Sequence, residues 1–222
     1  MKTTNKILAP ASLLAVLCAQ QAAAESATYF GLNVVSNYMS AGTTQSADKP
    51  ALQGYVEHNR ASGFYAGVWF STIDFSAYGL TDNFEIDPYI GYRGEIGKLG
   101  YDLSYTRYYY DDVGYLTDEL WLAMSYGATD QVSLGLDLGH SFSGGTKGVN
   151  YAIPRISYAF NDMISADAKA LFNSANSDVD WSAGLKYQVN DSLSANIRYH
   201  DSNFASSQVV FGVSWDGGIF SK

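Results

Sequence analysis

The stretch Val132-Ser133-Leu134-Gly135-Leu136-Asp137-Leu138-Gly139 carries the clearest structural signal in this chain. Its large apolar residues occupy every second position, and the residues between them are small, polar or charged. Successive side chains of a β-strand point to opposite faces of the sheet, so a strand has a period of two. This stretch is therefore predicted to be a strand with one apolar and one polar face.

The same alternation recurs along the chain, for example in residues 83–93, 181–189 and 193–200. No stretch after residue 24 is apolar enough for a transmembrane helix. About twelve alternating segments appear instead, each close to the length that a tilted transmembrane strand needs. They are residues 27–40, 51–58, 64–72, 83–93, 99–110, 117–126, 131–142, 151–160, 164–172, 180–189, 193–200 and 208–215.

Short and longer connections alternate between these segments. The short ones, residues 59–63, 94–98, 127–130, 161–163 and 190–192, contain Gly, Asn and Asp, which tolerate tight turns. The longer ones are residues 41–50, 73–82, 111–116, 143–150, 173–179 and 201–207. An even strand count with short periplasmic turns and longer outer loops is typical of outer-membrane barrels. The predicted fold is all-β, a transmembrane antiparallel up-and-down β-barrel with both chain ends on the periplasmic side.

Aromatic residues gather at both ends of the expected apolar faces, and Val, Leu, Ile and Ala lie between them. The two interfaces of a bilayer favour such belts, whereas a soluble β-sandwich, the all-β alternative, would place its large aromatics in mid-strand. The belt beside the short turns contains Phe64, Tyr92, Tyr101, Tyr126, Tyr158, Phe160, Tyr187 and Trp215. The belt beside the longer loops contains Tyr38, Phe70, Phe84, Phe142, Phe172, Trp181 and Tyr199.

The N-terminus has the pattern of a secretory signal peptide. Lys2 and Lys6 precede the apolar residues 7–19, and three alanines at residues 22–24 form a small-residue cleavage site. We therefore expect a signal peptide over residues 1–24, a barrel over residues 25–222, and location in the outer membrane of a Gram-negative bacterium. The alternative, an N-terminal anchor helix, lacks a long apolar run and a basic stop-transfer flank.

Composition excludes several classes of function. Lys2 and Lys6 leave with the signal, so 11 bases face 22 acids in the mature chain, whose net charge of −11 argues against nucleic-acid binding. The only cysteine, Cys18, leaves as well, so neither disulfides nor thiolate chemistry are available. The expected partners are outer-membrane lipids, the outer-membrane assembly machinery, and small hydrophilic solutes or cations.

Four motifs resemble the TorF family of porin-like envelope proteins of proteobacteria. They are NVVSNYMSAGTTQS (residues 33–46), KPALQG (49–54), GFYAGVW (63–69) and EIDPYIGYRG (85–94). Members of that family often carry arginine before the glycine of the first loop, and this chain has Ala41 there, so any role of that arginine is absent. The resemblance implies a porin-like fold and no particular substrate. Pro88 and Pro154 each interrupt an expected central strand, and we expect a local bulge at each.

The polar faces of the strands are expected to line the lumen. By alternation they carry Glu57, Glu85, Asp87, Arg93, Asp102, Glu119, Asp137, Arg155, Asp167, Lys169, Asp180, Lys186, Arg198 and His200. They also carry Tyr55, Tyr65, Trp69, Tyr89, Tyr108, Tyr110 and Trp121, which would narrow the lumen. Eight acids against five permanent bases predict a porin with a weak preference for cations. Alternatively, the charges pair and fill the lumen, as in small closed barrels.

An acidic outer mouth is also expected, formed by Asp48, Asp74, Asp82, Asp111, Asp112, Asp118, Asp178 and Asp201. Such a rim would concentrate cations at low salt, although outer loops are commonly just solvated and polar. The spacing of Asp111 and Asp112 does not match a calcium loop, so no metal or cofactor site is predicted.

Two other classes of function remain as alternatives to the porin. A non-conducting structural or adhesion-type barrel would use its outer loops for contacts, and these loops are short. An outer-membrane hydrolase would need a nucleophile beside His140 on the outward face, where Phe142 stands two residues along. The sequence therefore predicts a protein that is not an enzyme.

Overall fold

The computed structural model describes residues 26–220, and almost all of them lie in strands or their connections. Residues 1–24, the predicted signal peptide, lie outside this range, so cleavage after Ala24 stays a prediction. No helix in residues 26–220 is long and apolar enough to cross a membrane.

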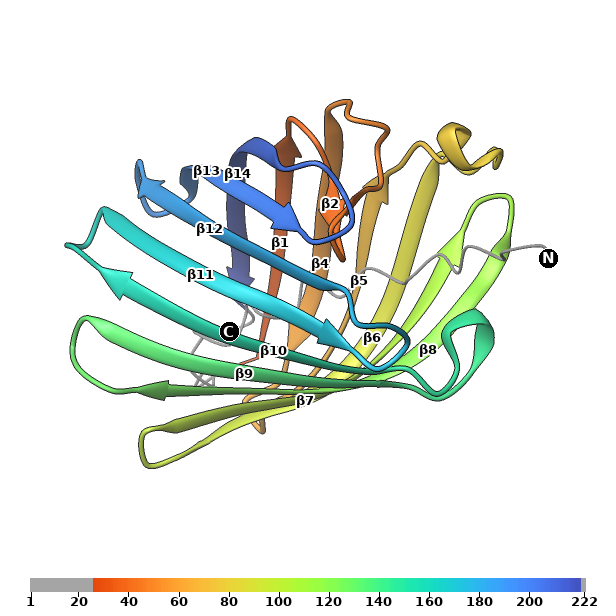
Figure 1. Ribbon diagram of the computed structural model, residues 1–222. Helices are drawn as coiled ribbons and strands as arrows, with labels where there is room; N and C mark the ends of the chain where they lie inside the picture. The colour runs from red at the N-terminus through yellow and green to blue at the C-terminus, as the bar shows by residue number, and fades with distance from the viewer. Residues whose placement is uncertain (1–25, 221–222) are drawn as a thin grey trace.

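Twelve antiparallel strands close into a barrel, which confirms the predicted fold class. Closure occurs at β1, which pairs with β14 on one side and β4 on the other, so no sheet edge is left open. Figure 1 shows β1, near the red end of the colour scale, beside β14, at the blue end. The strands are β1 (Ala27–Val35), β4 (Ala51–Asn59), β5 (Phe64–Thr72), β6 (Phe84–Ile96), β7 (Leu99–Tyr110), β8 (Gly114–Gly127), β9 (Val132–Ser141), β10 (Asn150–Ala159), β11 (Ile164–Asn173), β12 (Val179–Gln188), β13 (Leu193–Ser202) and β14 (Gln208–Phe220).

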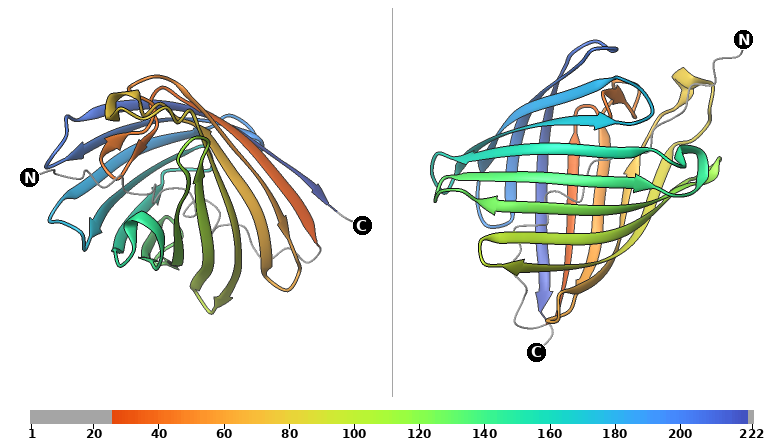
Figure 2. Two further views of the ribbon diagram at one scale, coloured as in Figure 1. Left: turned by 90° about the vertical axis from the view of Figure 1, so that its right-hand side faces the viewer. Right: turned by 60° about the horizontal axis from the view of Figure 1, so that its bottom comes forward.

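The connections at the two ends of the barrel differ in length. One end carries turns of two to four residues, and the other carries the first loop, residues 36–50, and the loop at residues 73–83. Two short 3-10 helices, η2 (Ser76–Tyr78) and η3 (Gly144–Thr146), also lie at this second end (Figures 1 and 2). The connection at residues 111–113 is short, which contradicts the longer loop expected at residues 111–116, because β8 begins earlier, at Gly114.

The outer surface of the barrel is apolar. In β9, Leu134, Leu136 and Leu138 are 45%, 36% and 41% exposed, whereas Asp137 between them is 5% exposed. This is the reverse of a soluble domain, whose large apolar side chains are mostly inside. Aromatic pairs join neighbouring strands on the outer face, with ring centroids 4.9 Å apart for Phe64 and Tyr92.

The predicted belt residues lie on this outer face, with Tyr38 as the exception. Tyr38 is 3% exposed and packs inside the barrel against Trp69, with ring centroids 5.8 Å apart. The segment predicted at residues 27–40 ends as a strand at Val35, where the chain turns inward, so the alternation no longer reports the outward face. A small hairpin, β2 (Met39–Ser40) and β3 (Thr43–Thr44), follows inside the barrel.

Three further details of the strands differ from expectation. The bulges predicted at Pro88 and Pro154 are absent, because the pairing register is the same on both sides of each proline. A register shift occurs instead between β7 and β8, at Tyr108 and Tyr109. The last strand does not stop at Trp215 but continues to Phe220, which pairs with Ala27.

Candidate pore inside the barrel

All fourteen residues predicted to line the lumen alternate with outward-facing neighbours and lie on the inner face of the barrel. Their burial divides them into two groups. The first group is buried and comes from β4 to β9: Glu57, Glu85, Asp87, Arg93, Asp102, Glu119 and Asp137. The second group is half-buried or exposed and comes from β10 to β13: Arg155, Asp167, Lys169, Asp180, Lys186, Arg198 and His200.

A buried ion cluster lies in the half of the barrel formed by β4 to β8. Arg93 donates to both oxygens of Glu57 at 3.0 and 3.2 Å and to Asp102 at 3.2 Å. Its guanidinium carbon lies 3.8 Å from the ring centroid of Tyr65, whose hydroxyl donates to Asp102. Arg93 also donates to Asn59 at 3.3 Å. Because every charge in the cluster has a partner, it joins four strands rather than offering a site to solvent.

Aromatic side chains fill the rest of this half. Tyr38, Tyr65, Trp69, Tyr89 and Tyr110 form one buried cluster with Phe75 from the loop after β5. Two inner glycines leave room for these rings, since a Cβ at Gly67 would collide with Tyr89 and one at Gly91 with Tyr65. The predicted lumen aromatics Tyr108 and Trp121 are also buried, whereas Tyr55 is half-buried. The aromatic narrowing predicted from the sequence is therefore concentrated on this side.

Three carboxylates lie within this filled half. Glu119 accepts from Ser141 Oγ at 2.6 Å and from Trp121 Nε1 at 2.9 Å, and Glu85 accepts from the Tyr38 hydroxyl at 3.3 Å. Asp87 lies beside them and is 4% exposed. No cluster of metal-ligating side chains occurs among residues 26–220, so these acids form no recognisable metal site.

The wall formed by β10 to β13 is more open. Arg155 donates to Asp137 at 2.6 Å, and Arg198 donates to the two oxygens of Asp167 at 2.5 and 2.6 Å. The side chain of Asp167 is 38% exposed. Its neighbours Ala166 and Ala168 face outward, so this exposure lies within the barrel. Water-accessible space therefore borders this wall.

The β2–β3 hairpin crosses the interior to reach the same wall. Met39, Ser40 and Ala41 line a cavity of about 20 Å³ together with Lys169, Asp180 and other wall residues. Ala41 and Gly42 have φ angles of 45° and 74°, the left-handed backbone that lets two residues turn a hairpin. Gly42 lies close to Ser202, the last residue of β13, and to Phe204 in the connection that follows. The hairpin narrows the lumen near its outer end.

Several of the acids predicted at the outer mouth make contacts within the chain, in the loops or, for Asp118, between β7 and β8. Asp82 accepts from the amides of Asp112 and Val113, and Asp111 accepts from the amides of residues 83 and 84. Asp118 accepts from Arg107 Nε at 2.6 Å. Lys49 Nζ lies 2.6 Å from Asp74, and this contact, together with hydrogen bonds from Ser76, holds the pKa of Asp74 below its usual range.

His140, the candidate for catalysis, lies on the outer face with Nδ1 2.8 Å from Asn150 Oδ1. Ser174 contacts Asn150 at 3.4 Å. The described residues place no hydroxyl in hydrogen-bond contact with this ring.

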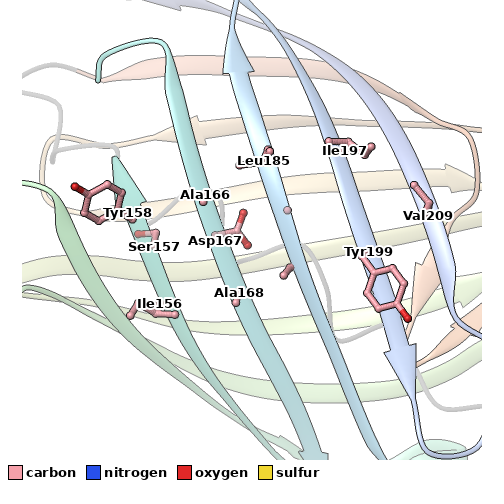
Figure 3. A pocket seen from close by; sticks show the side chains of 12 residues that line it. Ile156, Ser157, Tyr158, Ala166, Asp167, Ala168, Leu185, Ile197, Tyr199 and Val209 are labelled. Atoms are coloured by element: carbon pink, nitrogen blue, oxygen red, sulfur yellow. The ribbon is translucent and has the colours of Figure 1, made fainter. Parts of the chain in front are cut away.

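A shallow apolar groove of about 540 Å³ lies on the outer face over β10 to β14. In Figure 3 the larger side chains of Ile156, Tyr158, Leu185 and Ile197 surround the small Ala166 and Ala168. Its lining is mostly apolar, and Ser157 and Asp167, which alternate with outward-facing neighbours, also border it.

The family profile described as "Bacterial protein of unknown function (Gcw_chp)" matches residues 19–214. The chain belongs to this family. Neither this profile nor the solved structures below carry the TorF name, so that resemblance stays a prediction. No curated protein matches the chain in sequence.

Solved structures share the fold at low sequence identity. The "KdgM porin" superposes with a TM-score of 0.63 at 11% identity over 85% of this chain and 98% of that chain. The "NanC porin" gives 0.59 at 12% identity over 86% of this chain and all of that chain. Outer membrane phospholipase A from Escherichia coli gives 0.50 at 12% identity over 88% and 92%. Porins and an enzyme thus share this architecture, and function has to be argued from the site.

Alternation in the sequence placed the inner and outer faces of the strands but missed two features of the interior. It did not show that the first loop folds inward, because residues 36–40 continue the alternating pattern. It also did not distinguish buried from accessible inner charges. In the structure most of the inner acids are buried, whereas the charges on the β10–β13 wall are accessible.

Proposed function

We propose that the chain forms a pore in the outer membrane of a Gram-negative bacterium, through which small hydrophilic solutes or ions diffuse passively. The observation that carries this proposal is the exposed Asp167 side chain inside a closed barrel whose exterior is apolar. A polar, water-accessible interior within an apolar exterior is the arrangement that a membrane channel requires. The porin neighbours support the same fold.

Several features support the membrane location. The outer face carries Trp215 and Phe64 beside the short turns and Phe172 and Trp181 beside the longer loops, with aliphatic residues between them. Aromatic belts of this kind anchor a barrel at both interfaces. The predicted signal peptide, residues 1–24, would supply the export route, and the assembly machinery of the outer membrane would insert the barrel.

A non-conducting structural barrel is the second candidate. The aromatic filling of one half and the inward hairpin favour it, because together they leave only the β10–β13 side accessible. The cation preference predicted from the charge count remains untested.

Liposome swelling separates the two candidates. Proteoliposomes containing the refolded mature chain should swell in isosmotic solutions of small hydrophilic solutes, and the rate should fall as the solute becomes larger. Heat-denatured protein in the same lipid is the control. Swelling no faster than in this control, from liposomes with correctly folded protein, would favour the structural barrel.

A further inference from the structure

Charges are segregated across the interior of the barrel. The inner faces of β4 to β8 carry Glu57, Glu85, Asp87, Asp102 and Glu119, and within residues 26–220 Arg93 is the one inward-facing cation on these strands. The inner faces of β10 to β13 carry Arg155, Lys169, Lys186 and Arg198, with Asp167, Asp180 and His200. On β14, between β13 and β1, Asp216 also faces inward, is exposed, and accepts from the Tyr55 hydroxyl at 3.0 Å. Asp137 on β9 lies at the boundary and pairs with Arg155.

Burial removes the acidic side from the accessible space. Glu57, Glu85 and Glu119 are 0% exposed, whereas the side chains of Arg155 and Arg198 are 19% and 23% exposed. A solute in water can approach the second group and is kept from the first by aromatic rings. The interaction of two charges falls with distance and with the dielectric between them, so the wall that borders the water dominates what a solute experiences.

Two lysines on the accessible wall lack close partners. Neither Lys169 nor Lys186 forms a hydrogen bond or ion pair with any residue in the described range. Lys169 lies within electrostatic reach of Asp180, whose carboxylate interacts with the backbone amide of Gly42 in the hairpin. Lys186 is exposed and lies nearer the short-turn end. Its neighbours Leu185 and Tyr187 face outward, so Lys186 faces the lumen.

The arginines keep some capacity to bind although each is paired. Arg155 Nε is buried without a hydrogen-bond partner. Arg198 Nη2 donates to Asp167, and Nη1 donates to the Ser182 hydroxyl at 3.1 Å. A guanidinium has five donors in a planar fork that suits carboxylates and phosphates, so Arg198, whose side chain is 23% exposed, can offer further donors to a passing anion, whereas the free Nε of Arg155 is buried.

We propose that the solute path runs along the inner face of β10 to β13 and that its cations select small anionic solutes, carboxylates among them. The inference rests on the proposed pore and specifies its path and its substrate class. An anion entering from the short-turn end meets Lys186 first, then Arg198, and then Arg155 and its register partner Lys169, which lies beside the β2–β3 hairpin. The β2–β3 hairpin packs against this wall and leaves a cavity of only about 20 Å³, room for about one water, so a solute passes the outer end beside the hairpin or by displacing it.

Reversal potentials in planar bilayers test the selectivity. In a KCl gradient around 0.1 M, where the Debye length of about 10 Å leaves charges within the lumen only partly screened, the wild-type channel should pass chloride better than potassium. Replacing either lysine in the variants Lys169→Gln and Lys186→Gln should lower the chloride-to-potassium permeability ratio by about twofold or more. A unit charge about 8 Å away in water acts on each ion with roughly the thermal energy.

Glu119→Gln is the matched control, since it removes a buried charge and keeps the side-chain shape. It should leave the permeability ratio unchanged. A cation-selective wild-type channel, or a ratio that Glu119→Gln alters more than the lysine variants do, would overturn the inference while leaving the pore intact.

Cysteine labelling tests the path without relying on current. The mature chain has no cysteine, so single cysteines can be placed at Ser157 on the accessible wall and at Ser104 on the filled side, which is 2% exposed. In folded protein, Ser157→Cys should react with a water-soluble thiosulfonate, and faster with an anionic than a cationic reagent after correction for intrinsic reactivity. Ser104→Cys should stay unlabelled.

The outcomes of the two experiments separate the inference from the pore itself. Equal labelling at both positions, or faster labelling at Ser157→Cys by the cationic reagent, contradicts the path even if the channel conducts. A silent bilayer overturns the proposed pore, and the anion path through it falls as well.

Discussion

Replacing Arg93 with methionine should destabilise the barrel strongly. Arg93 is 6% exposed and is the only cation that the described residues place beside Glu57 and Asp102, which are 0% and 1% exposed. Removing one partner from a buried ion pair leaves an uncompensated charge and costs about 3 to 5 kcal/mol. With a urea dependence of about 2 kcal/mol per molar, the unfolding midpoint should fall by roughly 2 M.

The assay is urea unfolding of the folded barrel in lipid vesicles, followed by tryptophan fluorescence and by the gel shift of folded against boiled protein. Adding Glu57→Gln and Asp102→Asn to Arg93→Met removes the stranded charges and should recover most of the loss. Lys49→Met, which removes the exposed pair with Asp74, is the control and should change the midpoint little, since solvent screens that pair. If Arg93→Met shifts the midpoint no more than Lys49→Met does, the buried cluster is not a stabilising unit.

Three further predictions concern the loops and the outer face. Replacing residues 39–44 with a short glycine linker should raise the single-channel conductance, because the β2–β3 hairpin narrows the accessible side of the lumen; an unchanged conductance would place the constriction elsewhere. We expect no esterase activity from the wild type or from His140→Ala, and unchanged folding, since no nucleophile contacts this ring in the described chain; activity that the substitution abolishes would contradict this. The Ser76 amide, which donates to Asp74, should keep a constant NMR shift from pH 8 down to about pH 4 and move only below it. The lowered pKa of Asp74 means that this contact is present above the ordinary pKa and is lost as the pH falls through the folded-state value; a transition centred at about pH 4, where an unperturbed Asp titrates, would be inconsistent with the contact.

The strand alternation was sufficient to predict the closed sheet and the direction of most side chains. In β9, for example, the pattern of Leu136, Asp137 and Leu138 distinguishes the two faces directly. A barrel has one inside and one outside, so a period of two fixes the face of each strand residue once the apolar face is known. The same reasoning failed at Tyr38, because the alternation continues past the point where β1 ends.

Burial within the lumen could not be predicted from the pattern. The Tyr38 hydroxyl donates a hydrogen bond to Glu85, which lies 47 residues away in the sequence. The rings of Trp121 and Tyr151 stack with their centroids 5.4 Å apart. These contacts depend on which inner positions are glycine and on where the first loop turns, neither of which the period of two reports. The cation preference predicted from the charge count is untested, and the anion preference that we propose rests on which of these charges are accessible.

The prolines illustrate a similar limit. Pro88 and Pro154 each remove a donor from the ladder, and a bulge is the usual response. Here the register continues unchanged past both, and the irregularity lies at Tyr108 and Tyr109 instead. Local composition therefore indicated a disturbed ladder without indicating how the sheet accommodates it.

Single-channel recording from the refolded mature chain in a planar bilayer tests the pore most directly. Discrete current steps are expected, with a conductance below that of an open sixteen-stranded porin, because the filled half and the hairpin leave part of the cross-section accessible. A bilayer that stays silent while the gel shift shows folded, inserted protein would contradict the pore and leave a structural barrel.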